Sequence, residues 1–368
     1  MKLLQIVFSG LGGHASVGFS LIDADTEKKY THVIIFYGIE DVSEGYQNKC
    51  HEMGIDYFFV KKHVGLDIHS HKQVISLLKI IQPDIILLHA ISIIIPVSYY
   101  CLFRNTKLIS VEHQSNELKT TKDWILSFLI MLLSKKIVFL TEIYREQVKK
   151  KLRFTFRFKK SKVINNGINT AIFNSFNNIK IDKTNIRQNK SIGMLSRFTD
   201  NKDHLVLLEA FKLLLNRNNE NFKIKLLLAG DGITKTNLVR KVAELDLEQN
   251  VVFCGLLSEQ ESVEFLSSID LYVHASLGET MSTAIMQAMA CRKPIIASDV
   301  TGINNMLINQ KTALLVTPGN PEALAGAMWQ LLNQNELADI LANNAQQFAY
   351  NHFTNTAMFN QYHLLFNA

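Results

Sequence analysis

Apolar runs alternate with helical patterns along nearly the whole chain. The runs at 3–8 and 85–88 are almost continuously apolar, which is typical of strands buried on both faces of a parallel sheet. Between such runs, apolar residues recur every three or four positions, as at 71–81 and 204–216, and this spacing predicts amphipathic helices. Strands that alternate with helices in this way predict βαβ units, and therefore an α/β fold with doubly wound sheets.

The predicted strands form two groups. The first group is 3–8, 31–37, 57–60, 84–88, 107–111, 136–140 and 162–164. The second group is 191–195, 223–228, 251–253, 271–274, 294–298 and 313–316. The chain has 368 residues, more than a single core usually organises, so we expect two Rossmann-like domains.

The domain boundaries follow from a polar, asparagine-rich stretch between the two groups. We place an N-terminal domain at 1–172, a linker at 173–190 and a second domain at 191–350. A helix at 351–368 is expected to pack back on the first domain. Ligands of such sheets bind at the carboxyl ends of the strands, so the expected site is a cleft between the domains.

Composition indicates a cellular compartment, and the charge distribution reveals one basic segment. The four cysteines are scattered without C-x-x-C spacing, which favours buried thiols in a cytoplasmic protein. The apolar stretches at 80–103 and 124–140 are interrupted by charges or prolines, so no membrane-spanning helix is expected. The net charge is +6, and the segment from Lys149 to Lys162 contains no acid. Its cations and three phenylalanines fit an anionic membrane surface better than nucleic acid, and a solvated strand and turn explains them equally well.

Glycines come directly after the first predicted strand. Gly10, Gly12 and Gly13 precede a helix, and glycines in that place let backbone amides approach a phosphate. The third glycine is out of step with G-x-G-x-x-G and no acid ends the second strand, which disfavours a dinucleotide-dependent oxidoreductase. The alternative to a phosphate-binding loop at these glycines is a tight strand-to-helix turn.

Two later loops carry charged residues at strand ends. Arg197 and Lys202 follow the strand at 191–195, and a guanidinium and an ammonium suit a diphosphate leaving group. Taken alone, they are better explained as surface cations. Glu279 is the only carboxylate in the loop at 276–284, and no residue nearby in sequence is expected to pair with it. It can accept hydrogen bonds from sugar hydroxyls and stabilise an oxocarbenium-like centre, or simply cap the following helix.

The second half of the chain resembles the retaining glycosyltransferases of the GT-B fold, family 4. The motifs that carry the resemblance are, in the family's order, Arg197 with Lys202, Ala229-Gly230-Asp231-Gly232, Val252-Phe253-Cys254-Gly255, and Glu279 through Pro294 with Ala288-Met289-Ala290-Cys291. The first half resembles the family more loosely. Its motifs are Gly12-Gly13, Pro83-Asp84 with His89, Val111-Glu112-His113 and Asn166-Gly167-Ile168-Asn169.

The resemblance implies roles for individual residues. It implies that Glu279 binds the hydroxyls of the donor sugar, and that Arg197 and Lys202 bind the diphosphate. The other residues that it implies are Gly13, Ser282 and Thr283 for the diphosphate, Gly230, Gly255, Leu256 and Gln287 for the nucleoside, and His113, favoured over His89, near the anomeric carbon.

One residue departs from the family pattern. The second acid of the E-x7-E signature is Gln287 here, whose amide oxygen accepts a hydrogen bond without carrying a charge. Donor affinity or nucleotide preference is therefore expected to differ. Asp23-Ala24-Asp25 matches the D-x-D motif of a metal-dependent glycosyltransferase fold, but it ends a predicted helix and is interpreted as surface. No metal and no cofactor are expected.

The resemblance implies a retaining, metal-independent glycosyltransferase. It would move a hexose or N-acetylhexosamine from a nucleotide diphosphate sugar, with UDP favoured, to a glycan or polyprenyl-linked acceptor in bacterial surface-polysaccharide assembly. The N-terminal domain would present the acceptor. The enzyme would be cytoplasmic, at the inner face of the membrane if Lys149 to Lys162 binds there, and no nucleic-acid partner is expected. The alternative, which Gln287 motivates, is a nucleotide-sugar-binding protein without transferase activity.

Overall fold

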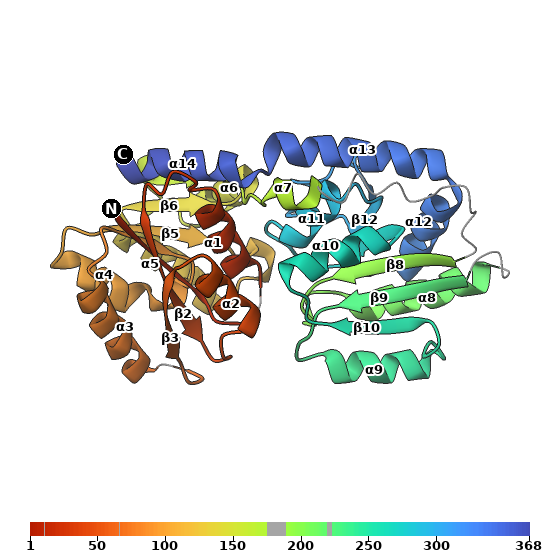
Figure 1. Ribbon diagram of the computed structural model, residues 1–368, viewed down its shortest axis with the longest axis horizontal. Coiled ribbons are helices and arrows are strands. Elements are labelled where there is room, and N and C mark those ends of the chain that lie inside the picture. The colour runs from red at the N-terminus through yellow and green to blue at the C-terminus, as the bar shows by residue number, and fades with distance from the viewer. Residues whose placement is uncertain (11, 66, 175–188, 219–222) are drawn as a thin grey trace. The chain divides into compact units, whose positions relative to one another are not determined.

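The computed structural model describes residues 1–10, 12–65, 67–174, 189–218 and 223–368 (Figure 1). The chain divides into two compact units. One is Met1–Gly167 together with Asn355–Ala368, and the other is Ile168–Thr354. Each unit is built around one parallel sheet with helices interleaved between its strands. The predicted α/β fold with two doubly wound sheets is confirmed.

The sheet of the N-terminal unit has seven strands within the described residues. They are β1 Lys2–Phe8, β2 Thr31–Gly38, β3 Asp56–Lys61, β4 Ile85–Leu88, β5 Lys107–Glu112, β6 Lys136–Phe139 and β7 Ser161–Val163. Their order is β3-β2-β1-β4-β5-β6-β7, so the chain changes direction across the sheet between β1 and β4. Ligands of doubly wound sheets bind outside the carboxyl ends of the strands at such a switch point.

Helices cover both faces of this sheet. They are α1 Gly13–Asp23, α2 Glu44–Glu52, α3 Ile68–Ile81, α4 Ile94–Leu102, α5 Thr121–Leu133, α6 Glu142–Lys151 and α14 Asn355–Asn367, with short 3-10 helices η1 Ile91–Ile93, η2 Asn116–Leu118 and η3 Phe158–Lys160. Because successive side chains of a strand point to opposite faces, β1 sends Leu4 and Ile6 into one core and Val7 into another. Strands buried on both faces explain the continuous apolar runs in the sequence.

The second unit repeats the scheme with six described strands. They are β8 Asn189–Leu195, β9 Lys223–Ala229, β10 Val251–Gly255, β11 Leu271–His274, β12 Ile295–Ser298 and β13 Leu314–Val316. Their order is β10-β9-β8-β11-β12-β13, which places the switch point between β8 and β11. The helices of this unit are α7 Thr170–Asn174, α8 His204–Arg217, α9 Lys235–Glu244, α10 Glu259–Ser268, α11 Thr283–Ala290, α12 Pro321–Asn333 and α13 Asn335–His352.

Local sequence sets where several helices begin. Thr120 with Asp123 forms a capping box at the start of α5, and Ser258 with Glu261 does the same for α10. Asn320 accepts a hydrogen bond from the Ala323 amide at the start of α12, with a proline at the first helical position. These caps satisfy backbone donors that have no partner inside the helix.

The end of the chain returns to the N-terminal unit. α14 packs on α1, and its carbonyls at Leu365 and Phe366 accept hydrogen bonds from the Lys107 ammonium at 3.1 and 3.0 Å. The unit boundaries, after Gly167 and before Asn355, lie a few residues from the expected 172 and 351. Most of the expected linker, 175–188, lies outside the described residues.

Candidate functional site

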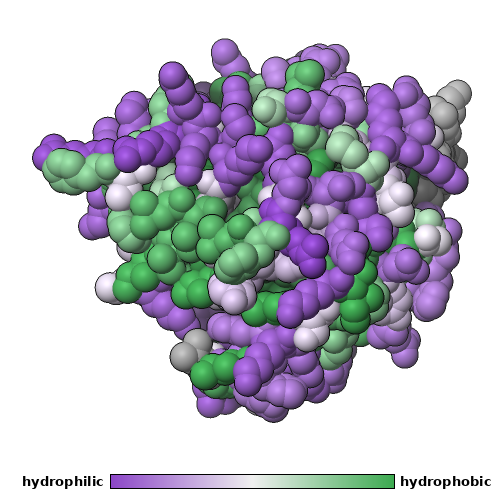
Figure 2. All heavy atoms as spheres, turned by 90° about the vertical axis from the view of Figure 1, so that its left-hand side faces the viewer, coloured by the Kyte–Doolittle hydropathy of each residue, from purple (hydrophilic) through white to green (hydrophobic). Residues whose placement is uncertain are grey.

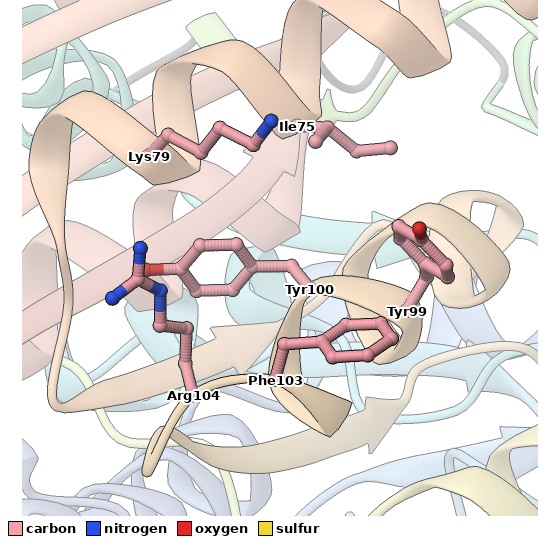
Figure 3. A pocket seen from close by; sticks show the side chains of 6 residues that line it. All are labelled: Ile75, Lys79, Tyr99, Tyr100, Phe103 and Arg104. Carbon is pink, nitrogen blue, oxygen red and sulfur yellow. The ribbon is translucent and has the colours of Figure 1, made fainter.

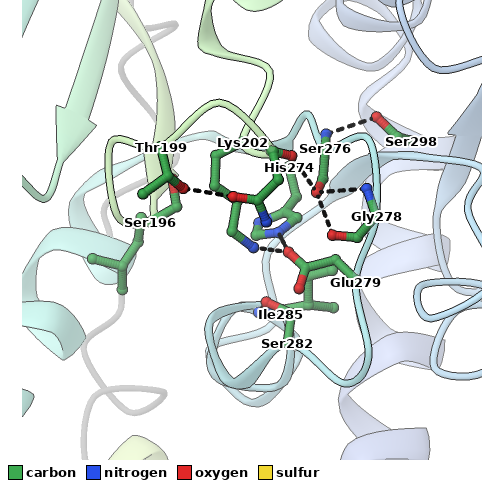
Figure 4. A network of polar contacts seen from close by, with 12 residues as sticks. Ser196, Thr199, Lys202, His274, Ser276, Gly278, Glu279, Ser282, Ile285 and Ser298 are labelled. Carbon is green, nitrogen blue, oxygen red and sulfur yellow. Dashed lines mark hydrogen bonds and ion pairs between the residues drawn. The ribbon is translucent and has the colours of Figure 1, made fainter. Parts of the chain in front are cut away.

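Glu279 lies in the loop between β11 and α11, at the switch point of the second sheet. Its carboxylate oxygen Oε1 accepts a hydrogen bond from His274 Nε2 at 2.7 Å and contacts the Lys202 ammonium (Figure 4). The Lys202 and Glu279 side chains are only 14% and 10% exposed. The expectation that no residue nearby in sequence pairs with Glu279 is therefore wrong, because His274 is five residues before it.

Two loops are joined to hold this pair. The loop from β8 to α8 carries Lys202, and its carbonyl at Asn201 accepts hydrogen bonds from Ser276 Oγ and from the Leu277 amide, both at 2.9 Å. The Ser276 amide in turn donates to Ser298 Oγ at 3.0 Å. The end of β8 and the end of β11 are neighbours in the sheet, so the fold itself brings these loops together.

A third loop supports Glu279 through its backbone. A Cβ on Gly302, in the segment after β12, would lie 1.8 Å from the Glu279 carbonyl oxygen and 2.8 Å from the Thr280 nitrogen. Only glycine lets the two chains approach so closely. Sequence reasoning did not single out Gly302 or the partnership of His274, and the only signal for His274 was its position at the end of a buried strand.

Burial controls the charges in this cluster. Burial, and then the charge of Lys202, holds the pKa of His274 well below its ordinary value, so the ring is neutral. A neutral His274 that donates from Nε2 to Glu279 accepts at Nδ1 from the Tyr272 hydroxyl, 3.0 Å away. Burial, followed by the charge of Arg197, lowers the pKa of Lys202, while the contact with Glu279 acts in the opposite direction.

Three other residues expected at the diphosphate, Arg197, Ser282 and Thr283, belong to the second unit and lie in or next to the two loops that hold this pair. Arg197 is exposed in the loop that also carries Lys202, and it is close enough to lower the pKa of that ammonium. Ser282 caps α11 by accepting a hydrogen bond from the Ile285 amide, and Thr283 is the first residue of that helix. A helix N-terminus adds partial positive charge to the two cations.

The residues expected at the nucleoside lie at the carboxyl ends of β9 and β10 and within α11. The Gly230 amide donates to the Gly255 carbonyl at 2.7 Å. A Cβ on Gly230, whose φ is +137°, would lie 1.9 Å from the Ser196 carbonyl oxygen, so the residue must be glycine. Leu256 is half exposed, and Gln287 is half-buried one turn after Thr283, on the same side of α11.

Three histidines meet at the carboxyl ends of strands in the N-terminal unit. His89 follows β4 and His113 follows β5, and His89 Nδ1 lies 2.7 Å from His113 Nε2. His14, next to Gly13 at the start of α1, stacks on His113 with ring centroids 4.2 Å apart. Burial lowers the pKa of His89 to about 3 and that of His113 well below its usual value, so both rings are neutral.

One expectation outside the site is wrong. Asp25, interpreted from the sequence as a surface residue, is buried, and its carboxylate accepts hydrogen bonds from the Lys29 and Tyr30 amides at 2.9 and 3.0 Å. It also lies 2.9 Å from His32 Nε2. This carboxylate therefore fixes the turn between α1 and β2.

Within the described ranges, no group of three or more histidine, cysteine, aspartate or glutamate side chains is arranged to hold a metal ion. In the same part of the chain, every helix is too short or too polar to cross a membrane.

Comparisons with known proteins agree with this geometry. Residues 11–172 match the family model described as Glycosyltransferase Family 4, and residues 176–348 match Glycosyl transferases group 1. An uncharacterized glycosyltransferase of Methanocaldococcus jannaschii is 28% identical over 53% of this chain and 50% of its own. The capsular polysaccharide biosynthesis glycosyltransferase CapM of Staphylococcus aureus is 24% identical over 55% of this chain and 56% of its own. The chain thus spans about half the length of these curated relatives.

The fold is shared with a solved structure over its full length. The crystal structure of Anabaena HepE in complex with UDP and glucose has a TM-score of 0.82 and 18% identity, and the match covers 100% of both chains. Two parallel doubly wound sheets in this sequence order define a protein of the GT-B fold. The chain belongs to the group 1 glycosyltransferases of that fold, with a Family 4 first half.

Proposed function

We propose that the protein is a retaining glycosyltransferase that uses a nucleotide diphosphate sugar, with UDP as the favoured nucleotide. It would transfer a hexose or N-acetylhexosamine to a glycan or polyprenyl-linked acceptor in surface-polysaccharide assembly. The observation that carries the proposal is the buried carboxylate of Glu279 in contact with Lys202 and His274 at a sheet switch point. The names of CapM and of the HepE complex with UDP and glucose support the acceptor class and the donor.

In this proposal the donor replaces the contact between Lys202 and Glu279. The diphosphate takes Lys202 and Arg197, and the sugar hydroxyls donate to Glu279. Each charge-assisted hydrogen bond contributes about 1.5–3 kcal/mol. The amides at the start of α11, near Ser282 and Thr283, receive the remaining negative charge. These positive groups are enough to stabilise the leaving diphosphate, so the proposed reaction does not require a metal ion.

The transfer step breaks the bond between the anomeric carbon and the diphosphate oxygen, and its electron pair stays on that oxygen. The acceptor oxygen bonds to the anomeric carbon on the same face of the sugar, and its proton passes to the leaving oxygen. Glu279 and the cations act on the charge that develops in this step, which is where stabilisation accelerates a reaction. The N-terminal unit is proposed to bind the acceptor, and its residues His113 and Gly13, at strand ends of that unit, are proposed to take part in the reaction.

The nucleoside end of the donor is assigned to Gly230, Gly255, Leu256 and Gln287. Gln287 offers one amide oxygen to a ribose hydroxyl in place of a carboxylate. The basic segment from Lys149 to Lys162 is proposed to contact an anionic membrane on the cytoplasmic side, where a polyprenyl-linked acceptor would lie.

A pair of variants tests the assignment of Glu279. Glu279→Gln should lower turnover about a hundredfold, because an amide in place of the carboxylate weakens the bonds to sugar hydroxyls and to the developing positive charge, while UDP affinity changes less than threefold. Nucleotide release measures turnover across UDP-, GDP- and ADP-sugars, and calorimetry measures binding. Glu248→Gln, at an exposed position, is the control. Equal losses of turnover and UDP affinity would contradict the role.

The alternative function, nucleotide-sugar binding without transfer, makes a different prediction. Gln287 favours it, because the ribose end of the site lacks the second acid. It predicts tight UDP binding without acceptor-dependent nucleotide release, and no effect of Glu279→Gln on the residual rate.

A further inference from the structure

One face of the N-terminal unit presents apolar side chains where surface helices usually present charges. α4 contains no charged residue, and Ile95, Tyr99 and Leu102 are exposed at the spacing of one helix face. Phe103 follows α4 and is 71% exposed, and Leu102 is 77% exposed. Figure 2 shows hydrophobic side chains gathered into a patch on the side of this unit that carries α4.

The neighbouring helix extends the patch. α5 packs against α4 and has no charged residue from Trp124 to its end at Leu133. Ile125, Phe128 and Leu132 are exposed at i, i+3 and i+7, which is again one helix face. We call these side chains, together with those of α4 and Phe103, the α4–α5 face. An apolar surface of this extent marks an interaction site in a soluble domain.

Cations border the α4–α5 face. The basic segment, Lys149 to Lys162, contacts both ends of α5. The Lys151 ammonium lies 5.8 Å from the ring centre of Trp124 near the start of the helix, and Lys160 Nζ donates a hydrogen bond to the carbonyl of Ser134, just after its end, at 3.1 Å. Within this segment Phe154 is 81% exposed, beside the exposed side chains of Arg153 and Arg157.

A hollow of ≈ 250 Å³ lies where α3 meets α4. The side chains that line it are Ile75, Lys79, Tyr99, Tyr100, Phe103 and Arg104 (Figure 3). Lys79 projects from α3, and Arg104 lies on the other wall beside the ring of Tyr100. Neither cation forms an ion pair within the part of the chain that the structure describes. Two free cations among aromatic rings suit a phosphate attached to an apolar molecule.

We propose that the α4–α5 face docks on an anionic phospholipid membrane, with its apolar side chains in the interface and the hollow between Lys79 and Arg104 holding a lipid phosphate. Apolar residues bordered by lysine and arginine are the composition of helices that lie in a membrane surface. A second copy of the chain is a poorer partner, because a symmetric contact would place each basic border against its equal. Nucleic acid is also a poorer partner, because this face offers few hydrogen-bond donors apart from its border.

The inference does not rest on the proposed transfer reaction. It concerns surfaces of the N-terminal unit alone, and it can be tested without any sugar donor. If both are correct, the membrane brings the enzyme to a lipid-linked acceptor.

The test is vesicle binding by the full chain. Trp329→Phe leaves Trp124, at the start of α5, as the reporting indole, and its emission should shift to shorter wavelength on vesicles that contain phosphatidylglycerol. Leu102→Ser with Phe103→Ser should weaken that binding at least tenfold. Lys79→Ala with Arg104→Ala should weaken vesicle binding about twenty-five-fold, because each cation contributes about fivefold. This loss should occur only on anionic vesicles. Ile233→Ser with Lys311→Ala, exposed positions in the second unit, should change nothing.

Three results would overturn the inference. One is equal binding of pure phosphatidylcholine vesicles and anionic vesicles, and another is unchanged binding by the Leu102→Ser/Phe103→Ser variant. The third is a dimer of the unaltered protein that this variant dissociates in sedimentation, since that would assign the face to a second copy. Transfer to a soluble acceptor is measured on the same samples. A protein that binds vesicles but transfers no sugar would leave the docking surface standing and the proposed function refuted.

Discussion

At the scale of single residues, Lys202 and Glu279 are opposite charges with little access to water. Taking two ions out of water is costly, and their attraction offsets that cost only while both are present. The hydrogen bond from His274 stabilises the carboxylate further. The contribution of each residue to stability therefore depends on its partner.

A double-mutant cycle makes this dependence measurable. Lys202→Met should lower the free energy of unfolding by about 3 kcal/mol, because it removes the ammonium that compensates the charge of the buried Glu279 carboxylate. Lys202→Met combined with Glu279→Gln should recover most of the loss. Urea unfolding gives all four corners of the cycle. Lys235→Met is the control, because its pair with Asp231 is about 40% exposed on both sides and contributes under about 1 kcal/mol. Equal losses in the two lysine variants would contradict this account.

The sequence predicted a site at Glu279, Arg197 and Lys202 because each follows a strand end and matches a motif with fixed spacing. It could not identify the side chains that meet them. His274 Nε2 reaches Glu279 only because the loop after β11 folds back over that strand. The burial of Asp25 depends on hydrogen bonds from a turn several residues later. Such contacts depend on how loops close, which short-range patterns do not record.

At the scale of elements, loops at the ends of β8, β11 and β12 position one carboxylate. Gly302 belongs to the last of these loops and touches the Glu279 backbone, although the two residues are far apart in the sequence. The close approach of the two backbones leaves no room for a side chain. The position of Glu279 is therefore set by loop packing as well as by its own segment.

Gly302→Ala should displace that loop. Because the new methyl group would overlap the Glu279 carbonyl, we expect a loss of about 1–3 kcal/mol in unfolding free energy and up to a hundredfold in turnover. Gly326→Ala is the matched control, since its Cβ would meet nothing closer than 4.0 Å and alanine favours the helix α12. Retention of full turnover in Gly302→Ala, with stability intact, would show that the loop adapts.

Buried histidines predict how stability depends on pH. Burial lowers the pKa of His89 to about 3 and that of His204 to about 4, both below the value of about 6.5 in an unfolded chain. The unfolded state therefore binds more protons, so this stability is complete above pH ~6.5 and is lost as the pH falls toward the folded values. Each histidine should lower the free energy of unfolding by about 1.4 kcal/mol for each pH unit below ~6.5.

Urea unfolding at several values between pH 7.5 and 5, a range above most carboxyl pKa values, measures this slope. His89→Asn should make the slope shallower by the contribution of one histidine. Gln73→Asn, at an exposed position of α3, should leave the slope unchanged. A slope that is identical in all three proteins would exclude His89 as a source of acid sensitivity.

At the scale of the whole molecule, each unit has its own sheet, packed against hydrophobic clusters of the same unit. The strand positions were predictable because buried parallel strands read as continuous apolar runs. The strand order was not predictable, because it depends on contacts between distant parts of the chain. The last helix, expected at 351–368, corresponds to α14, which begins at Asn355. α14 belongs to the first unit, and Phe359, Tyr362 and Phe366 are buried there.

A substitution in α14 should therefore affect the N-terminal unit and leave the second unit unchanged. Phe359→Ala is expected to destabilise the N-terminal unit by about 3 kcal/mol through the cavity that it leaves. UDP binding, which we assign to the second unit, should persist. Calorimetric unfolding and UDP titration on the same variant measure the two effects, with the exposed Leu364→Ala as control. Loss of UDP affinity in parallel with stability would show that the units fold as one.

On the proposed function, the contact between Lys202 and Glu279 has a consequence for which ligand stays bound. A complete nucleotide sugar would offer a new partner to both residues, since its diphosphate would contact the ammonium and its sugar hydroxyls the carboxylate. A nucleotide diphosphate without its sugar would contact the ammonium and would give the carboxylate no new partner. The site would therefore hold the donor through both charges and the product through one, and the contact between Lys202 and Glu279 would form again when the product leaves.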